Sequence, residues 1–234
     1  MRLNIKTLIT VSIILLLVSS YSIYHEYLET SRILRLTTAI SFFILFLINK
    51  GYRYYKLLFA FLCFIVSDVF MLFYENIVLN KLTSLVTVVG YITLISYIIK
   101  KVQIKNLNKY VISFFVALIL FNIYKLYDII HTIKYVLLDH VQEMLLYMYG
   151  ASLITMCALS VNHNFKENTK RSMYFMLATF SLALSDLCAF TGYYHKIYSV
   201  YYADRAFYIL ALYFIVRHTH QLSQKEDEPI FFEE

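Results

Sequence analysis

The sequence contains few helix-breaking residues and few charges. Its 234 residues include one proline and four glycines, and 15% of them are charged whereas 60% are hydrophobic. A soluble domain carries more charge, and a disordered chain is far less hydrophobic. The ten-residue segments of alternating hydrophobicity that are typical of an outer-membrane barrel are also missing. These shortages favour a helical, multi-pass membrane protein.

Motifs for the common cofactors and nucleophiles are absent as well. The chain has no glycine-rich phosphate loop, no Gly-x-Ser-x-Gly elbow and no His-Glu-x-x-His pair, and its three cysteines lack the spacing of a metal site. Asp128 and His131 are three residues apart, as are His140 and Glu143, and this spacing can place two metal ligands on one helix face. Polar residues of an interfacial helix give the same pattern. We therefore expect neither a metal nor another cofactor.

Eight apolar runs are each long enough, or nearly so, to cross the hydrocarbon core as a helix. The expected fold class is therefore all-α, a polytopic integral membrane protein with eight transmembrane helices. The expected spans are residues 8–24, 34–48, 57–74, 82–99, 110–124, 144–161, 172–193 and 201–216.

Three segments around these spans carry expectations of their own. The first run resembles a signal peptide, but it continues to Tyr24 with a weak cleavage motif, so we expect an uncleaved first span. Residues 125–143 mix charged and apolar side chains, which predicts an amphipathic piece in the membrane interface. Residues 221–234 form a polar, acidic tail that we expect to be disordered.

The net charge of +6 could indicate nucleic-acid binding, but the basic residues lie mainly in short connections between apolar runs. Of the 21 Lys and Arg residues, 14 fall on the side that holds both termini and 7 on the other, where we count Arg35 and Arg205. The positive-inside rule then predicts cytoplasmic termini. We expect an integral protein of a bacterial inner membrane, with no nucleic-acid partner. Because tryptophan is absent, the 23 tyrosines are expected to supply the interfacial aromatic belt.

Two Ser-Asp pairs interrupt apolar spans. Ser67-Asp68 and Ser185-Asp186 are 118 residues apart, about half the chain, and both spans start from the same side. Carboxylates inside membrane helices are costly and mark functional sites by default, although a structural partner such as Lys or Arg is the alternative. The offset suggests two parallel four-helix halves, which would place both aspartates at the same depth.

Two carboxylates that face one cavity can act as a general acid and a general base, because their surroundings can favour the neutral form of one and the charged form of the other. We expect Asp68 and Asp186 to have these roles. Ser67 and Ser185 point about 100° away from the aspartates around the helix, so we expect them to bond to a neighbouring helix. His195 and Asp204 are expected in the connection after the seventh span, either in solvent or at the rim of a cavity.

With eight spans, cytoplasmic termini and Asp motifs in the third and seventh spans, the chain resembles the YhhN-like lysoplasmalogenase family. The family motifs are a small residue followed by Asp in the third helix and Ser-Asp-x-x-Leu-Ala in the seventh. Here they read Ser67-Asp68-Val69-Phe70-Met71-Leu72 and Ser185-Asp186-Leu187-Cys188-Ala189. Tyr97 matches a family tyrosine in the fourth helix, whereas Leu94 stands where the family has histidine and Ser67 where it usually has glycine.

The resemblance implies hydrolysis of the vinyl ether bond of a lysophospholipid, with Asp68 and Asp186 as acid and base, Ser67, Ser185 and Tyr97 in support, and a membrane lipid as partner. The missing histidine leaves two other hypotheses open. One is a transporter of a small or proton-coupled solute, which the scarcity of Gly and Pro within spans disfavours. The other is a noncatalytic assembly or sensory partner, which we expect if the aspartates face ion-pair partners.

Overall fold

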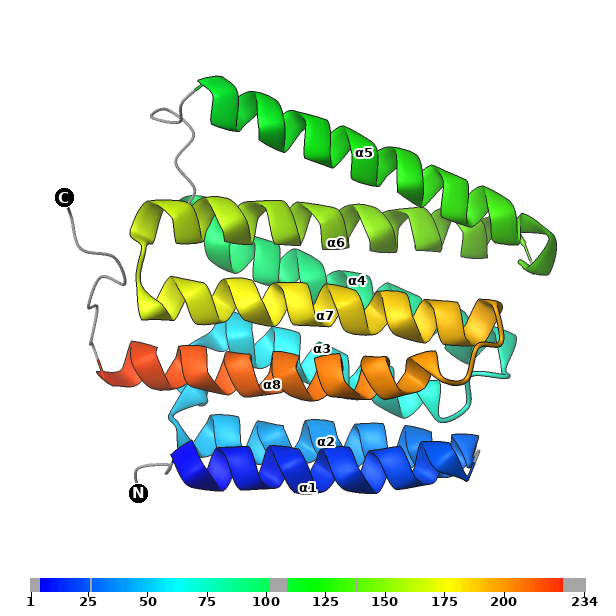
Figure 1. The fold of residues 1–234 in the computed structure, drawn as a ribbon, viewed down its shortest axis with the longest axis horizontal. Coiled ribbons are helices and arrows are strands. Elements are labelled where there is room, and N and C mark those ends of the chain that lie inside the picture. The colour runs from blue at the N-terminus through cyan, green and yellow to red at the C-terminus, as the bar shows by residue number, and fades with distance from the viewer. Residues whose placement is uncertain (1–4, 26, 102–108, 138, 225–234) are drawn as a thin grey trace.

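The computed structural model describes residues 5–25, 27–101, 109–137 and 139–224. These residues form eight α-helices and three 3₁₀ turns (Figure 1). In chain order they are α1 (Ile5–Tyr24), α2 (Leu28–Ile48), η1 (Gly51–Arg53), α3 (Tyr55–Met71), α4 (Ile77–Ile98), η2 (Ile99–Lys101), α5 (Lys109–Ile133), η3 (Lys134–Val136), α6 (His140–Glu167), α7 (Lys170–Tyr194) and α8 (Val200–Gln224).

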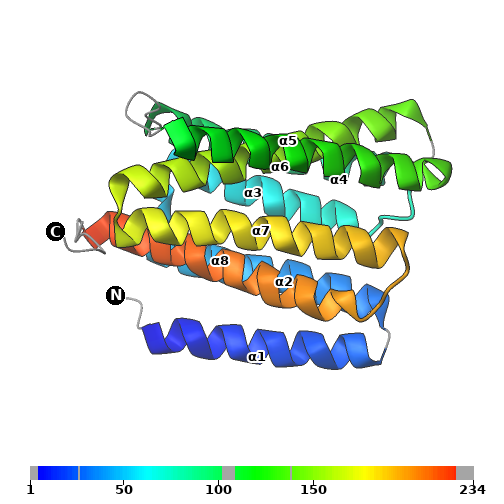
Figure 2. The same cartoon turned by 45° about the horizontal axis from the view of Figure 1, so that its top comes forward.

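The helices run alternately up and down in one bundle, so that the first and last described helices begin and end at the same end of the molecule (Figure 1). We call this the terminal end, and the opposite end, where α3 connects to α4 and α7 to α8, the distal end. Helix α8 packs against α7, α1 and α2, α3 packs between α2 and α4, and α6 packs between α4 and α7. Helix α5 packs mainly against α6, which it overlaps in the view of Figure 2, and its first turns lean away from the bundle in Figure 1.

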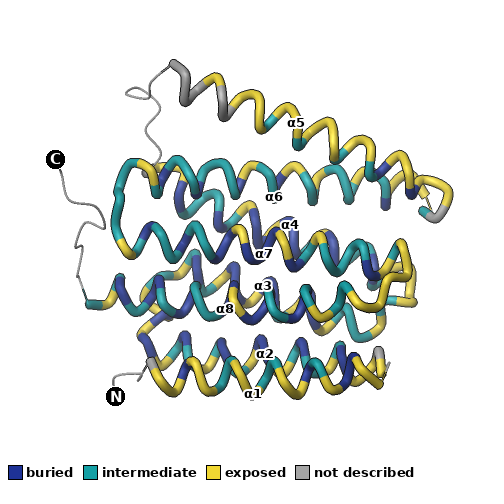
Figure 3. Tube along the Cα trace, in the orientation of Figure 1, coloured by how far each residue is buried: buried dark blue, intermediate teal, exposed yellow. Residues whose placement is uncertain are grey.

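The outer faces of the helices are apolar and exposed. Figure 3 shows this along α1 and α5 in particular, where Leu17 and Leu120 are more than half exposed. Six helices, α1, α2, α4, α5, α6 and α7, contain segments long and apolar enough to cross a membrane. An apolar surface of this extent suits lipid rather than water. The described chain therefore has the character of an integral, multi-pass membrane protein.

Helices α3 and α8 fall short of the length and apolarity of the other six, for different reasons. Helix α3 has 17 residues, which is at the lower limit of about 17–25 residues for a span. Helix α8 has 25 residues but includes Asp204, Arg205 and Arg217. Six of the eight predicted spans are therefore supported by the length and composition of their helices. Helices α3 and α8 do not meet this criterion, although they lie alongside the other helices (Figure 1).

Several helices extend beyond the predicted spans. Helix α2 begins at Leu28 rather than near residue 34, so Arg35 lies inside the helix and not at its edge. Residues 125–133 are not a separate interfacial piece, because α5 continues without a break to Ile133. Helix α8 extends to Gln224 into the predicted tail, and the remaining tail residues lie outside the described part of the chain.

The largest buried apolar cluster lies in the terminal half of the bundle. Phe61 of α3, Leu94 of α4, Phe175 of α7 and Leu212 of α8 are all at most 3% exposed and belong to this cluster. A Cβ on Gly90 would lie 2.9 Å from the ring of Phe64, so glycine permits the close approach of α4 to α3. The buried Asp68 and Asp204 lie on the distal side of this cluster.

A capping box starts α7. The Thr169 side chain accepts a hydrogen bond from the backbone N–H of Ser172, and the Ser172 hydroxyl accepts one from the backbone N–H of Thr169. The Ser172 hydroxyl also donates to Asn164 of α6 at 2.9 Å. The box satisfies backbone donors that would otherwise lack partners and joins α6 to α7.

Replacing Thr169 with alanine should lower the free energy of unfolding by about 1 kcal/mol, because the backbone N–H of Ser172 loses its acceptor. Thr169→Ser keeps the hydroxyl and should unfold like the unmodified protein. Denaturant-induced unfolding in detergent measures both variants. Equal stability of the alanine and serine variants would contradict the assignment of this cap.

Candidate functional site

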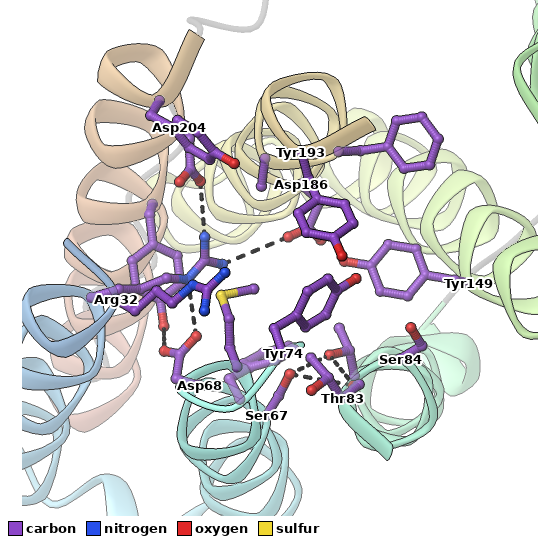
Figure 4. Close-up of a pocket in the computed structure, with 18 of the residues that line it drawn as sticks. Arg32, Ser67, Asp68, Tyr74, Thr83, Ser84, Tyr149, Asp186, Tyr193 and Asp204 are labelled. Carbon is purple, nitrogen blue, oxygen red and sulfur yellow. Dashed lines mark hydrogen bonds and ion pairs between the residues drawn. The ribbon is translucent and has the colours of Figure 1, made fainter. Parts of the chain in front are cut away.

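One guanidinium group lies at the centre of the bundle. Arg35 of α2 is 6% exposed, and its Nε is 2.9 Å from Asp68 Oδ1 on α3. Its Nη1 is 2.9 Å from Asp204 Oδ1 on α8, and its Nη2 is 3.8 Å from Asp186 Oδ1 on α7. Figure 4 shows Asp68, Asp186 and Asp204 converging on this guanidinium from three sides. Four helices are thus joined through one side chain.

Each of the two aspartates in the Ser-Asp pairs also binds a tyrosine. Tyr208 of α8 donates a hydrogen bond to Asp68 Oδ2, and Tyr91 of α4 donates one to Asp186 Oδ2. The Arg35 guanidinium carbon lies 4.1 Å from the centre of the Tyr208 ring, which adds a cation–π contact. Asp68 therefore has two charge-assisted partners at close range, whereas Asp186 has the tyrosine and a more distant cation.

Each serine of the Ser-Asp pairs bonds to a neighbouring helix, as the sequence predicted. Ser67 Oγ is 2.7 Å from Thr87 Oγ1 of α4, and Ser185 Oγ donates to Asp204 Oδ1 of α8 at 2.6 Å. The two aspartates are 118 residues apart, and both the Thr87–Asp204 and Tyr91–Tyr208 pairs are 117 residues apart. The two halves of the chain therefore place matching contacts around Asp68 and Asp186.

A second arginine completes the network. Arg205 follows Asp204 in α8 and its Nη1 lies 2.9 Å from Asp204 Oδ2. Its Nη2 donates to the Ser31 hydroxyl at 2.9 Å and to the Ser31 carbonyl at 3.1 Å, which ties α8 to the start of α2. Asp204 and Arg205 are 1% and 4% exposed. Buried ions in such numbers require mutual neutralisation, because each would be costly alone.

The network holds one more acid than base. Three carboxyl groups, those of Asp68, Asp186 and Asp204, meet two guanidinium groups, those of Arg35 and Arg205. If every group were ionised, a net negative charge would remain in a buried site. A single bound proton removes that charge. The site can thus hold a proton on one of its carboxyl groups without any further partner.

A cavity of about 140 Å³ lies beside the network. Asp68, Asp186 and Arg35 line it, and it extends toward the distal end between tyrosines that include Tyr74 and Tyr193 (Figure 4). Because Asp68 and Asp186 contact the same guanidinium, their bound oxygens lie within about 9 Å of each other, a separation at which two carboxylates can act on one substrate and one water. The two predicted site residues therefore share one cavity.

The other sequence-predicted residues have different positions. Tyr97 bonds to His218 Nε2 at 3.0 Å, six residues of α4 closer to the terminal end than Tyr91, and it is not among the residues that line the cavity. Asp204 was expected in solvent or at a cavity rim; it is buried within α8 and lines the cavity. In the part of the chain that the structure describes, no three His, Cys, Asp or Glu side chains are arranged so that they could hold a metal ion.

Sequence reasoning missed Arg35 and Arg205. Both were counted as basic residues of outer connections, whereas the structure buries both within helices. A charge count along the helices would have revealed them, since intramembrane acids need intramembrane bases. Tyr91 and Tyr208 were missed too, although the 117-residue offset between them is close to that of the Ser-Asp pairs.

Arg35→Gln should lower the free energy of unfolding by about 3–5 kcal/mol, because it leaves three buried carboxyl groups with one guanidinium. Adding Asp204→Asn to that variant restores the original charge difference. The amide oxygen can still accept from Arg205, and the hydroxyl of Ser185 can accept from the amide N–H. The double variant should therefore recover at least half of the lost stability. Thermal unfolding in detergent measures both.

Arg53→Gln is the matched control, since Arg53 is exposed in η1 and should change stability by less than about 0.5 kcal/mol. A double variant that is no more stable than Arg35→Gln would show that charge balance does not hold this network together.

Compared with protein-family models, with curated proteins and with solved structures, the chain gives no match. The functional argument therefore depends on the chemistry of the buried network and its cavity.

Proposed function

We propose that this chain is an intramembrane hydrolase that cleaves the vinyl ether bond of a lysophospholipid, in the manner of the lysoplasmalogenases that its motifs resemble. One observation carries the proposal: Asp68 and Asp186 reach one buried cavity from separate helices and are held there by one arginine. The ion pairs of both aspartates with Arg35 are the feature that we expected of a noncatalytic partner. The cavity beside them favours a catalytic site, because an ion pair that only joined helices would require no cavity.

The reaction needs one neutral acid and one carboxylate. Protonation of the outer vinyl carbon turns the ether into an oxocarbenium ion, which nearby carboxylates stabilise electrostatically. Water attacks the carbon next to the oxygen and gives up a proton to a base, forming a hemiacetal. The hemiacetal then breaks its C–O bond to release a fatty aldehyde and a glycerophospho-base, and the proton returns to the acid.

The contacts favour Asp186 as the acid and Asp68 as the base. Asp68 receives hydrogen bonds from Arg35 Nε at 2.9 Å and from Tyr208, both of which favour a carboxylate. Asp186 lies 3.8 Å from Arg35 and is thus the carboxyl group with the weakest cationic contact. The proton that balances the network would therefore reside on Asp186, opposite a carboxylate that can accept a proton from water.

We propose in addition that the chain has eight spans arranged as two parallel halves, α1–α4 and α5–α8. The charged residues of α3 and α8 at the site, such as Asp68 and Arg205, are buried, so both helices can present apolar faces outward. Contacts α2–α3 and α3–α4 have counterparts in α6–α7 and α7–α8, and α2–α8 has one in α4–α6. The matching tyrosine–aspartate bonds support the same relation.

A transporter that uses the same carboxyl groups is the second candidate, because the excess carboxyl group could bind a coupled proton. Transport requires access from both ends of the bundle. Here the apolar cluster that includes Phe61, Leu94 and Leu212 separates the network from the terminal end. Helices α3 and α7 are also continuous through Asp68 and Asp186 rather than broken at the site.

Asp68→Asn and Asp186→Asn should each lower the rate of aldehyde release from a vinyl-ether lysophospholipid by about 10²–10⁴-fold, because each removes one partner in proton transfer. The assay uses the purified chain in proteoliposomes and detects the aldehyde. Asp128→Asn, at an exposed position of α5, is the control and should remain fully active.

Thermal unfolding of each variant separates loss of chemistry from loss of fold. Turnover that survives in folded Asp186→Asn would exclude the proposed acid. Flux of a solute that leaves the vesicles chemically unchanged, with no aldehyde formed, would favour the transporter.

A further inference from the structure

A third arginine lines the cavity, and it differs from the other two in its counter-ion. Arg32 of α2 pairs with Glu75, with Nη1 2.7 Å from Oε1 and 3.0 Å from Oε2. The Glu75 side chain is 72% exposed, whereas that of Arg32 is 16% exposed. The carboxylates that bind Arg35 are buried. Arg32 is thus a largely buried cation whose partner can move into water.

Glu75 belongs to the connection between α3 and α4, outside both helices. Partial burial raises the pKa of its carboxyl group, but the hydrogen bond from Arg32, a backbone hydrogen bond and the charge of Arg32 together outweigh this effect, and the pKa lies below its ordinary value. Glu75 is therefore an anion at neutral pH. A different monovalent anion could replace Glu75 on Arg32 without changing the net charge of the cavity. Because Glu75 is itself exposed, little of its hydration is lost in the pair or regained when it leaves.

The position of Arg32 matches the depth of lipid headgroups. Tyr74, Tyr193, Tyr194 and Tyr201 line the same distal part of the cavity, and tyrosines concentrate at membrane–water interfaces. Arg32 precedes Arg35 by three residues, so it lies roughly 4.5 Å nearer the distal end along the axis of α2. Arg32 and Asp186 line the same cavity, so a phosphate at Arg32 would place the adjoining glycerol unit and its ether bond in the cavity that Asp186 also lines.

The cavity has both polar and apolar walls, as the headgroup and the chain of a lipid require. Its lining includes Phe64, Met71, Leu146 and Phe190 beside the carboxyl groups. A phosphate group could come from a lipid headgroup or from a soluble phosphodiester, and both would use the same contact with arginine. The apolar lining favours the lipid.

We propose that Arg32 is the phosphate-binding residue for a single-chain phospholipid, and that Glu75 occupies this position until the headgroup replaces it. The proposal rests on the proposed function for the fate of the lipid but concerns binding alone. The two residues consequently have opposite effects: Arg32 attracts the headgroup and Glu75 competes with it.

The test measures binding of radiolabelled 1-palmitoyl lysophosphatidylcholine to the full chain in nanodiscs, with 1-palmitoylglycerol as the probe that lacks phosphate. The acyl lipid has no vinyl ether bond, so the result does not depend on hydrolysis. Arg32→Gln should weaken binding of the phospholipid by about tenfold or more, because a charge-assisted hydrogen bond is lost. It should leave binding of 1-palmitoylglycerol within twofold of the unmodified chain.

Glu75→Gln should tighten binding of the phospholipid several-fold, since the competing carboxylate is gone. Arg53→Gln, which removes a positive charge at the terminal end, is the matched control and should change neither probe. Soluble glycerophosphocholine in excess should displace the bound phospholipid only weakly, because it lacks the apolar chain.

Three results would overturn the proposal. One is an equal loss of both probes, or of neither, in Arg32→Gln, and another is weaker phospholipid binding in Glu75→Gln, as expected if the ion pair were only structural. The third is displacement by glycerophosphocholine at concentrations similar to those of the lipid, which would assign the contact to a soluble ligand. If the unmodified chain shows the expected binding pattern but does not hydrolyse the vinyl-ether lipid, the proposed reaction is refuted and the phosphate site is not.

Discussion

The contacts of the Arg35 guanidinium constrain the rest of the structure. A buried arginine is tolerated only where its charge and its donors are matched, and here the match comes from α3, α7 and α8 at once. These partners are far apart in the sequence, so the network can form only when the bundle has closed around α2. Its geometry then fixes the depth of Asp68 and Asp186 relative to each other, and with it the shape of the cavity.

The two halves of the chain place similar groups around the network. The differences between these groups give Asp68 and Asp186 unequal surroundings. Thr87 bonds to one Ser-Asp serine, whereas Asp204 has the equivalent contact in the second half. Arg35 compensates for the added acid, but it lies closer to Asp68 than to Asp186. Two carboxyl groups in equal surroundings would favour the charged form equally. Asp204 and Arg35 have no counterpart in the other half, and they make the surroundings of Asp68 and Asp186 unequal.

Much of the fold could be read from the sequence, because hydrophobicity alone marks long apolar helices. Asp68 and Asp186 were recognisable for the same reason, since a carboxyl group within an apolar run stands out. Arg35 did not stand out, because a basic residue near the start of a run looks like part of a polar connection. Its role depends on Asp204, which is 169 residues away and was itself assigned to a connection. The residues next to Arg35 in the sequence give no indication of a partner that lies so far along the chain.

The apolar cluster between the network and the terminal end has a consequence for the energetics of the site. Phe61, Leu94 and Leu212 are buried on that side, while the tyrosine-lined part of the cavity faces the other. The route by which water and protons would reach the network therefore runs through the tyrosine-lined part of the cavity. We expect the protonation of the network to follow the pH at the distal end of the bundle.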